Sequence, residues 1–271
     1  MKELDWNTIG FLKRYLRLQF EFDQASTQLN ISPLNWDSSH FNAGMHKLNY
    51  VPENCTPDEI KAILPKKTSQ DKRYHCFAEV PSEANGAIQV LSKIGFTLVE
   101  SRITYFHLLE NLNPPENPTR AAVEADIPWL KKTASGAVNP NDRYHNDAFF
   151  SQEAANRYLE TYIENCIRGF AETVFVPDLE KPPHSFAALS RIHLENSEEI
   201  QPLYRIPLTA CLPENKGWHY HLCLSALHYA KHKNAAALVM TTQTSNKAVI
   251  HNCEKLGFRF GSSFHIFAKE L

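Results

Sequence analysis

The sequence predicts a mixed α/β fold, and three observations support this prediction. The composition is that of a globular chain, with 43% hydrophobic and 21% charged residues among 271. The second half alternates segments of strand-like and helix-like periodicity. Two distant segments repeat one pattern, a helix followed by Gly-Phe and a strand. At about 100–200 residues per domain, the chain is long enough for one large or two modest domains.

The composition also argues against several classes of protein. The formal net charge is -2, whereas a protein that mainly binds nucleic acid needs a basic face. No run of about 18 apolar residues occurs, so we expect no membrane-spanning helix. Charged residues interrupt Met1–Glu21, which therefore lacks the apolar core of a signal peptide. Six scattered cysteines without a C-x-x-C pair indicate reduced thiols and a cytoplasmic protein.

The best candidate for a domain boundary is segment 111–118, which contains three prolines and three asparagines. Such a segment cannot continue a helix or a central strand, so we interpret it as an extended linker. It divides the chain into domains 1–115 and 116–271. A second proline-rich segment, 177–185, predicts a loop between two strands.

The repeated pattern aligns Ser82–Phe96 with Thr244–Phe258 without gaps, with identical Ile, Lys, Gly and Phe at matching positions. In both segments apolar residues recur at helical spacing until glycine ends the helix. Alternating strands are expected next, over Thr97–Leu108 and Arg259–Ala268. We interpret the repeat as a duplicated α/β module, although four matches in fifteen positions leave chance open.

Further elements of the second half follow from the spacing of apolar residues. They are a helix (Gln152–Ile167), two antiparallel strands (Phe186–Leu194 and Ile200–Leu212), a second helix (Tyr220–Lys233) and a strand (Ala235–Thr242). A polar turn, Glu195–Glu198, joins the two strands, and the loop Pro213–Gly217 precedes the second helix. Asn246 stands where its side chain would cap the last helix.

The loop that ends at Gly217 is a candidate anion site, because backbone N–H groups at a helix N-terminus bind groups such as the diphosphate of coenzyme A. The chain runs from strand through glycine-containing loop, helix and strand to a helix led by Asn246 and ended by Gly257-Phe258. This order resembles the core of the GNAT acyltransferases. By contrast, His228 and His232 lie one helical turn apart without a third ligand, so we expect no metal site.

Within that superfamily the chain resembles the dTDP-4-amino-4,6-dideoxygalactose (dTDP-fucosamine) N-acetyltransferases. The resemblance rests on short motifs in a shared order: Leu34–Phe41, Ile94–Glu100, Asp126–Pro128, Asp142–Asp147, Tyr162–Asn165 and Thr242–Asn246. It implies the GNAT acyl-CoA N-acyltransferase fold, an α/β fold with a mixed sheet. Residues 1–115 would form a partial GNAT-like domain, and residues 116–271 the GNAT acetyltransferase domain.

The resemblance also implies a reaction, N-acetyl transfer in polysaccharide biosynthesis. The 4-amino group of a dTDP-linked amino-deoxyhexose would attack the thioester of acetyl-CoA directly. Acetyl-CoA is then the co-substrate, with no metal, and the partner is a small-molecule nucleotide sugar, with no nucleic acid and no membrane. A homodimer is compatible with this function. A non-catalytic GNAT-fold binding protein and an acyltransferase for another amine are the alternatives.

Site residues are implied by the same resemblance. Backbone N–H groups of the strand with Ala210, Cys211 and Leu212 would bind the thioester oxygen. The diphosphate would lie against Lys216, Gly217, Trp218 and His219. Asn246 would contact the pantetheine arm, with an ordinary helix cap as the alternative. On the acceptor side the implied residues are Arg143, Tyr144 and His145.

His145 is implied as a catalytic residue that orients a hydroxyl or accepts the proton of the amine. The alternative is a loop that an Asp–Arg pair stabilises. Two residues depart from the group's pattern. His219 replaces the second glycine of G-x-G and would crowd a diphosphate, unless a protonated His219 or His221 pairs with it. Cys253 replaces a tyrosine that protonates the leaving thiolate; it is either a catalytic proton donor or a buried core residue.

Overall fold

The computed structural model describes residues 29–66, 73–192 and 201–271. Contacts divide the chain into two compact units that are discontinuous in sequence. Unit 1 comprises Met1–Ile103, Pro140–Ala154 and Ser262–Leu271, and unit 2 comprises Thr104–Asn139 and Ala155–Gly261. The predicted division into 1–115 and 116–271 concerns modules of the sequence rather than these spatial units, and it stays a prediction.

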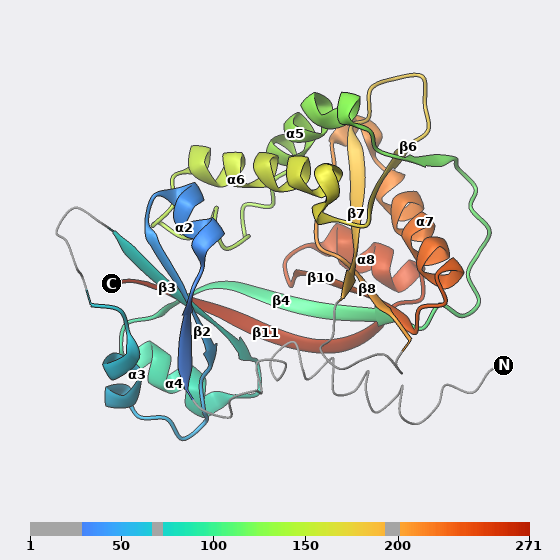
Figure 1. The fold of residues 1–271 in the computed structure, drawn as a ribbon. Coiled ribbons are helices and arrows are strands. Elements are labelled where there is room, and N and C mark those ends of the chain that lie inside the picture. The colour runs from blue at the N-terminus through green and yellow to red at the C-terminus, as the bar shows by residue number, and fades with distance from the viewer. Residues whose placement is uncertain (1–28, 67–72, 193–200) are drawn as a thin grey trace. The chain divides into compact units, whose positions relative to one another are not determined.

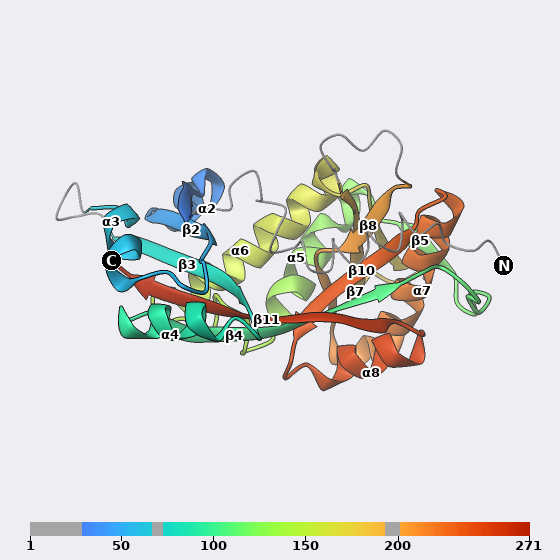
Figure 2. The same cartoon turned by 90° about the horizontal axis from the view of Figure 1, so that it is seen from below.

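Unit 1 contains a mixed sheet with the strand order β1-β2-β3-β11-β4. The strands are β1 (Asn30–Pro33), β2 (Gly44–Tyr50), β3 (Tyr74–Pro81), β4 (Thr97–His107) and β11 (Arg259–Glu270). Strands β2 and β3 are parallel, whereas β1 pairs with β2 and β11 pairs with β3 in antiparallel fashion. Figure 2 shows β11 between β3 and β4. The last residues of β4, from Thr104 on, and the first residues of β11, up to Gly261, belong to unit 2.

Helices α3 (Pro57–Ile63) and α4 (Asn85–Lys93) lie on one side of β2 and β3 (Figure 1). Ile60 and Leu91 from these helices share one apolar core with Cys76 and Ala78 of β3. Because side chains alternate along a strand, His75, Phe77 and Glu79 point to the opposite face. There Phe77 packs in a second cluster, and α2 (Asn35–Phe41) and the segment 140–151 contribute further side chains. This second face is where the candidate site of unit 1 lies.

Unit 2 contains the strand order β4-β10-β8-β7-β6-β5, and β9 pairs with β7. Its strands are β5 (Thr119–Ala121), β6 (Thr173–Pro177), β7 (Ser185–Ile192), β8 (Leu203–Ile206), β9 (Thr209–Cys211) and β10 (Ala237–Gln243). Helices α5 (Ile127–Gly136) and α6 (Gln152–Asn165) lie on one side of β7, and α7 (Trp218–His232) lies on the other (Figure 1).

The core of unit 2 explains these positions. Leu130 of α5 and Ile163 of α6 pack in one cluster with Phe186 and Ala188 of β7. On its other side, α7 contacts β6, β7 and α8 (Lys247–Lys255). In the described part of the chain no helix is long and apolar enough to cross a bilayer.

Most sequence predictions for the second half are confirmed, including the α/β class and the loop between β6 and β7. The prediction of a single strand over Ile200–Leu212 is wrong, because the described part of this segment forms two strands, β8 and β9. Pro207 lies between them and lacks the N–H group that a strand ladder requires. The helix predicted over Gln152–Ile167 ends at Asn165 and continues as a π-helical turn. The turn Glu195–Glu198 and the segment Met1–Glu21 lie outside the described residues.

The two repeated segments adopt the same local structure. Helices α4 and α8 begin and end at aligned positions, and strands β4 and β11 also begin at aligned positions. The glycines that end the helices, Gly95 and Gly257, both have φ 85°. The next residue closes the turn in each copy, with Phe96 N–H donating to Leu91 O (3.0 Å) and Phe258 N–H donating to Cys253 O (2.9 Å). This agreement supports a duplicated module.

The copies have exchanged their final strands. In unit 1, β3 of the first copy pairs with Phe264–Glu270 of β11, the strand that follows the second copy. In unit 2, β10 of the second copy neighbours β4, the strand that follows the first. Within unit 2, Thr104 and Thr241 of these two strands form a hydroxyl–hydroxyl hydrogen bond of 3.0 Å. Each unit is therefore completed by residues from the other half of the sequence.

Candidate functional site

A divergence of two parallel strands is the main candidate site of unit 2. Strand β8 pairs with β10 from Leu203↔Ala237 to Ile206↔Met240. After Pro207 the chain continues as β9, whose only strand partner among the described residues is β7. The register against β7 shifts at this point. Ser190 of β7 pairs with Arg205 of β8, and Ala187 of β7 pairs with Thr209 of β9. Three residue steps along β7 therefore lie opposite four steps along the segment that contains β8 and β9. This is a β-bulge, a feature that often redirects strands beside binding sites.

The bulge determines which backbone groups of β9 face the divergence. Leu212 N–H donates to His184 O (3.0 Å), and Leu208 O accepts from Ala188 N–H (2.9 Å). In an antiparallel ladder every second residue forms its backbone hydrogen bonds with the partner strand. Ala210, midway between Leu208 and Leu212, therefore also faces β7, whereas the N–H groups of Thr209 and Cys211 point away from it. Of the three residues predicted to offer N–H groups, Cys211 is therefore the one whose N–H lies on the open side.

Helix α7 begins beside this strand and brings the predicted loop residues together. Gly217 is its N-cap at φ 101°, a left-handed conformation, and no atom lies within 4 Å of where a Cβ would be. The backbone N–H groups of Trp218 and His219 point at the Cys211 thiol. These contacts lower the pKa of the thiol, but burial raises it by more, so the net shift of the pKa is upward. Lys216 is exposed. Gly217 itself is exposed, so its backbone is accessible to an anionic group at this helix start.

His219 does not lie in this loop as a charged group. Its side chain is buried, with 8% of the residue exposed. Nδ1 accepts a hydrogen bond from Asn252 of α8 (2.9 Å), and Nε2 lies 3.7 Å from the Cys223 sulfur. Burial lowers the pKa of His219 to about 4, so the ring is neutral near pH 7 and supplies no positive charge to a phosphate. The His221 ring contacts the Asn117 amide at 3.0 Å.

Asn246 and Cys253 are the remaining predicted residues of unit 2. The Asn246 side chain caps α8 by accepting a hydrogen bond from Val249 N–H (3.3 Å), as its sequence position predicts. Cys253 is 1% exposed, and its sulfur lies 3.7 Å from that of Met240. Burial, with a contribution from Glu254, raises the pKa of Cys253 to about 12. These facts favour the core-residue alternative, and the proton-donor role stays a prediction.

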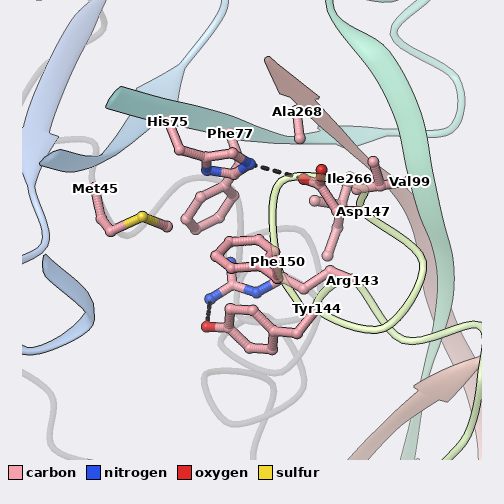
Figure 3. A pocket seen from close by; sticks show the side chains of 10 residues that line it. All are labelled: Met45, His75, Phe77, Val99, Arg143, Tyr144, Asp147, Phe150, Ile266 and Ala268. Carbon is pink, nitrogen blue, oxygen red and sulfur yellow. Dashed lines mark hydrogen bonds and ion pairs between the residues drawn. The ribbon is translucent and has the colours of Figure 1, made fainter. Parts of the chain in front are cut away.

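The predicted acceptor residues lie in unit 1, on the second face of its sheet. Arg143 lies over the rings of Phe77 and Tyr144, at 4.1 and 4.4 Å from their centroids. It also donates to the Tyr144 hydroxyl, which in turn donates to Asp37 (2.9 Å). Figure 3 shows Arg143 and Tyr144 beside a small cavity. The predicted alternative, an Asp–Arg pair that stabilises this loop, has a counterpart in Arg143 and Asp37, 3.6 Å apart.

His145 is held in place by its own loop. Its Nδ1 lies 2.6 Å from Asp142 Oδ2, and its side chain is 2% exposed. The other oxygen of Asp142 accepts from the N–H groups of Tyr144 and His145. This arrangement supports a positioning role in the loop at least as well as the predicted catalytic role, which stays a prediction.

A second histidine–carboxylate pair in unit 1 is not predicted from the sequence. His75 Nε2 lies 2.7 Å from Asp147 Oδ2, and both residues line the same cavity (Figure 3). The residues are far apart in sequence, and no motif spacing joins them. The only local signal is a polar residue at an inward position of a strand. Among the described residues, no cluster of three or more His, Cys, Asp or Glu side chains has the geometry of a metal site.

These features define the mixed α/β fold of the GCN5-related N-acetyltransferases. A GCN5-related N-acetyltransferase from Kribbella flavida superposes with a TM-score of 0.57 at 12% identity, over 95% of both chains. One from Sphaerobacter thermophilus gives 0.52 at 10%, over 89% of this chain and 76% of that one.

A third solved structure is a GCN5-related glucosamine N-acetyltransferase region of a fungal multi-domain GH3 beta-N-acetylglucosaminidase. It gives a TM-score of 0.53 at 10% identity, over 72% of this chain and 25% of that chain. At such identities the similarity shows the fold alone. No protein-family model and no curated protein matches the sequence.

Proposed function

We propose that the chain is an N-acetyltransferase that uses acetyl-CoA as acetyl donor. The observation that supports this most is the divergence of β8–β9 from β10 next to the Gly217-led start of α7. The Cys211 N–H, on the side of β9 that faces away from β7, would stabilise negative charge on a thioester oxygen. The open space around Gly217 at the start of α7 leaves room for a diphosphate close to the backbone. Six free thiols support a cytoplasmic enzyme.

The proposed acceptor is the 4-amino group of a dTDP-linked 4-amino-4,6-dideoxyhexose. The neutral amine attacks the thioester carbon, the C–S bond breaks, and the CoA thiolate takes up a proton while the new amide nitrogen loses one. Arg143, Tyr144 and His145 are proposed for the acceptor side. The support is the motif order in the sequence, and the fungal glucosamine N-acetyltransferase region is a fold relative that acts on an amino sugar.

Cys211 provides a direct test of acetyl-CoA binding. It and Cys55 are both partly exposed cysteines, and burial raises the pKa of each thiol. Alkylation by iodoacetamide, read by peptide mass spectrometry, should slow about tenfold at Cys211 when acetyl-CoA is present at ten times its dissociation constant. Cys55, in unit 1, is the internal control. Unchanged rates at both cysteines in millimolar acetyl-CoA would contradict the proposal.

A non-catalytic binding protein is the second candidate, and burial of Cys253 favours it because the proposed proton donor is then missing. Release of free CoA thiol separates the candidates. We expect release with a dTDP-linked 4-amino-4,6-dideoxyhexose and not with a simple primary amine. Release with simple amines alone would indicate another acceptor, and binding without any release would indicate the non-catalytic protein.

A further inference from the structure

A short segment of unit 2, residues 136–139, connects the ends of the two strands that diverge. At one end of the segment, a Cβ on Gly136 would lie 3.0 Å from Cδ2 of Leu212, the residue that follows β9. At the other end, the side-chain amide of Asn139 donates a hydrogen bond to Oε1 of Gln243, the last residue of β10 (3.0 Å). The segment therefore spans the divergence, and all four residues belong to unit 2.

The segment lies on the face of the sheet that carries α5, opposite the start of α7. Side chains alternate along a strand, and the Cys211 thiol lies against the first turn of α7. Ala210 packs instead in the core cluster that contains Leu130 of α5, and Leu212, two residues further on, shares the face of Ala210. The divergence therefore has α7 on one face and α5, with segment 136–139, on the other.

This placement determines what an acyl group would meet. In the proposed function the diphosphate lies at the start of α7, and the thioester oxygen lies at the Cys211 N–H. The acyl chain leaves the thioester carbon on the side opposite the sulfur of CoA, so it extends away from α7 and toward segment 136–139. On that face the chain neighbours of Cys211 are Ala210 and Leu212, with Cα atoms about 3.8 Å from its own. Leu212 is the larger and the more exposed of the two, so an acyl chain would contact it first.

The backbone of Gly136 limits where the Leu212 side chain can lie. Carbon atoms in contact are normally about 3.5–4.0 Å apart, so the 3.0 Å distance shows that the leucine fills the space beside this glycine. Gly136 is the last residue of α5 and does not have a positive φ, so its backbone conformation does not require glycine. Its small size therefore serves the contact with Leu212, and the leucine cannot move further toward α5.

We propose that Leu212, packed against Gly136, restricts the acyl group of the CoA donor to about the size of acetyl. This inference rests on the proposed function and identifies a residue that determines which acyl-CoA the chain accepts. A longer acyl group requires that Leu212 move, and α5 blocks that movement on one side. The Asn139–Gln243 hydrogen bond holds the other end of segment 136–139. In apolar pockets one additional methylene group changes selectivity by about 10- to 200-fold.

Butanoyl-CoA, whose acyl group is two methylene groups longer than acetyl, is the probe. In isothermal titration calorimetry, the full-length protein should bind acetyl-CoA at least about tenfold more tightly than butanoyl-CoA. Leu212→Ala removes the obstructing side chain, so the two affinities should then agree within about threefold. Leu159→Ala is the matched control, because Leu159 of α6 is also partly buried and packs against the core cluster of unit 2. This variant should retain the preference for acetyl-CoA.

Gly136→Ala tests the contact with Leu212 directly. Alanine is favourable in a helix, so the added methyl group acts mainly on what lies beside it. In the Leu212→Ala background this methyl group occupies part of the space that the leucine has vacated. The double variant should therefore regain part of the preference for acetyl-CoA that Leu212→Ala loses.

The results separate this inference from the proposed function. Suppose that acetyl-CoA binds, but the wild-type protein does not discriminate, Leu212→Ala keeps the preference, Leu159→Ala loses it, or the double variant regains nothing. Any of these results would show that Leu212 does not set the acyl size, while the proposed function is retained. If neither acyl-CoA binds the wild-type protein at millimolar concentration, the proposed function is wrong, and this inference is wrong with it.

Discussion

Asn252 donates a hydrogen bond from its side-chain amide to Nδ1 of His219, over 2.9 Å. This contact joins α8 to the first turn of α7. It holds the imidazole in the interior of unit 2, although the sequence places this histidine where a diphosphate-binding loop would have glycine. The backbone at Gly217 therefore has an open approach while the histidine serves the packing of two helices.

The buried His219 should make stability depend on pH. Burial lowers its pKa to about 4 in the folded protein, against about 6.5 in the unfolded chain. The unfolded chain therefore takes up a proton first as the pH falls, and between about pH 6.5 and pH 4 the free energy of unfolding should drop by up to about 3 kcal/mol. Urea denaturation at a series of pH values measures this drop.

The control for this prediction is His251, which is exposed on α8. His219→Gln should flatten the acidic drop, whereas His251→Gln should leave it unchanged. An equally steep drop in His219→Gln would show that other groups cause it.

Gly217 and Gly169 form a matched pair of substitutions. Both have positive φ, 101° and 112°, and neither has an atom within 4 Å of its Cβ position. Alanine at either site should lower the free energy of unfolding by about 1 kcal/mol. Only Gly217→Ala should also weaken acetyl-CoA binding, by about tenfold in isothermal titration calorimetry. Equal affinities for the two variants would place the diphosphate elsewhere.

Asn246 allows the cap and the predicted pantetheine contact to be separated. Serine also caps helices well, so Asn246→Ser should keep the stability that Asn246→Ala loses, about 1 kcal/mol. If the amide also binds the pantetheine arm, both variants should bind acetyl-CoA up to about tenfold more weakly. Normal affinity in Asn246→Ser would leave Asn246 with the cap alone.

Cys253→Ala tests the predicted proton donor. Because the thiol is buried against Met240, we expect a loss of about 1–2 kcal/mol in stability and unchanged turnover per folded molecule. Cys223→Ala, at another buried cysteine, controls for the stability loss. A fall in kcat at Cys253 that Cys223→Ala does not reproduce would restore the catalytic role.

Separate expression of 1–115 and 116–271 tests the exchanged strands. The first fragment lacks Phe264–Glu270, the partner of β3, and the second lacks the part of β4 next to β10. We expect neither fragment to show a cooperative unfolding transition alone, and the mixture to recover one. Two independently folded fragments would mean that the exchange is dispensable.

Residues that begin or end helices predict much of the secondary structure in the second half of the chain. Gly95 and Gly257 end helices where the pattern places them, and Asn246 caps α8 as expected, because these effects depend on neighbouring residues only. The sequence also identifies the loop before α7. It does not reveal the bulge at Pro207, whose effect depends on which strands lie on either side.

Contacts between distant segments were beyond the sequence. Nothing near His75 indicates that Asp147 faces it, and nothing near His219 indicates Asn252. The strand exchange is hidden for the same reason: a strand's sequence shows that one of its faces is buried but does not name its neighbour.

The exchanged strands also affect how the protein is made. During synthesis β3 leaves the ribosome long before Phe264–Glu270, the segment of β11 that pairs with it. The edge of β3 that pairs with β11 therefore stays unpaired while most of the polypeptide is still being synthesised. An open edge of this kind invites pairing with other nascent chains. Protection of that edge by a chaperone would therefore matter most for the unit whose residues are translated first.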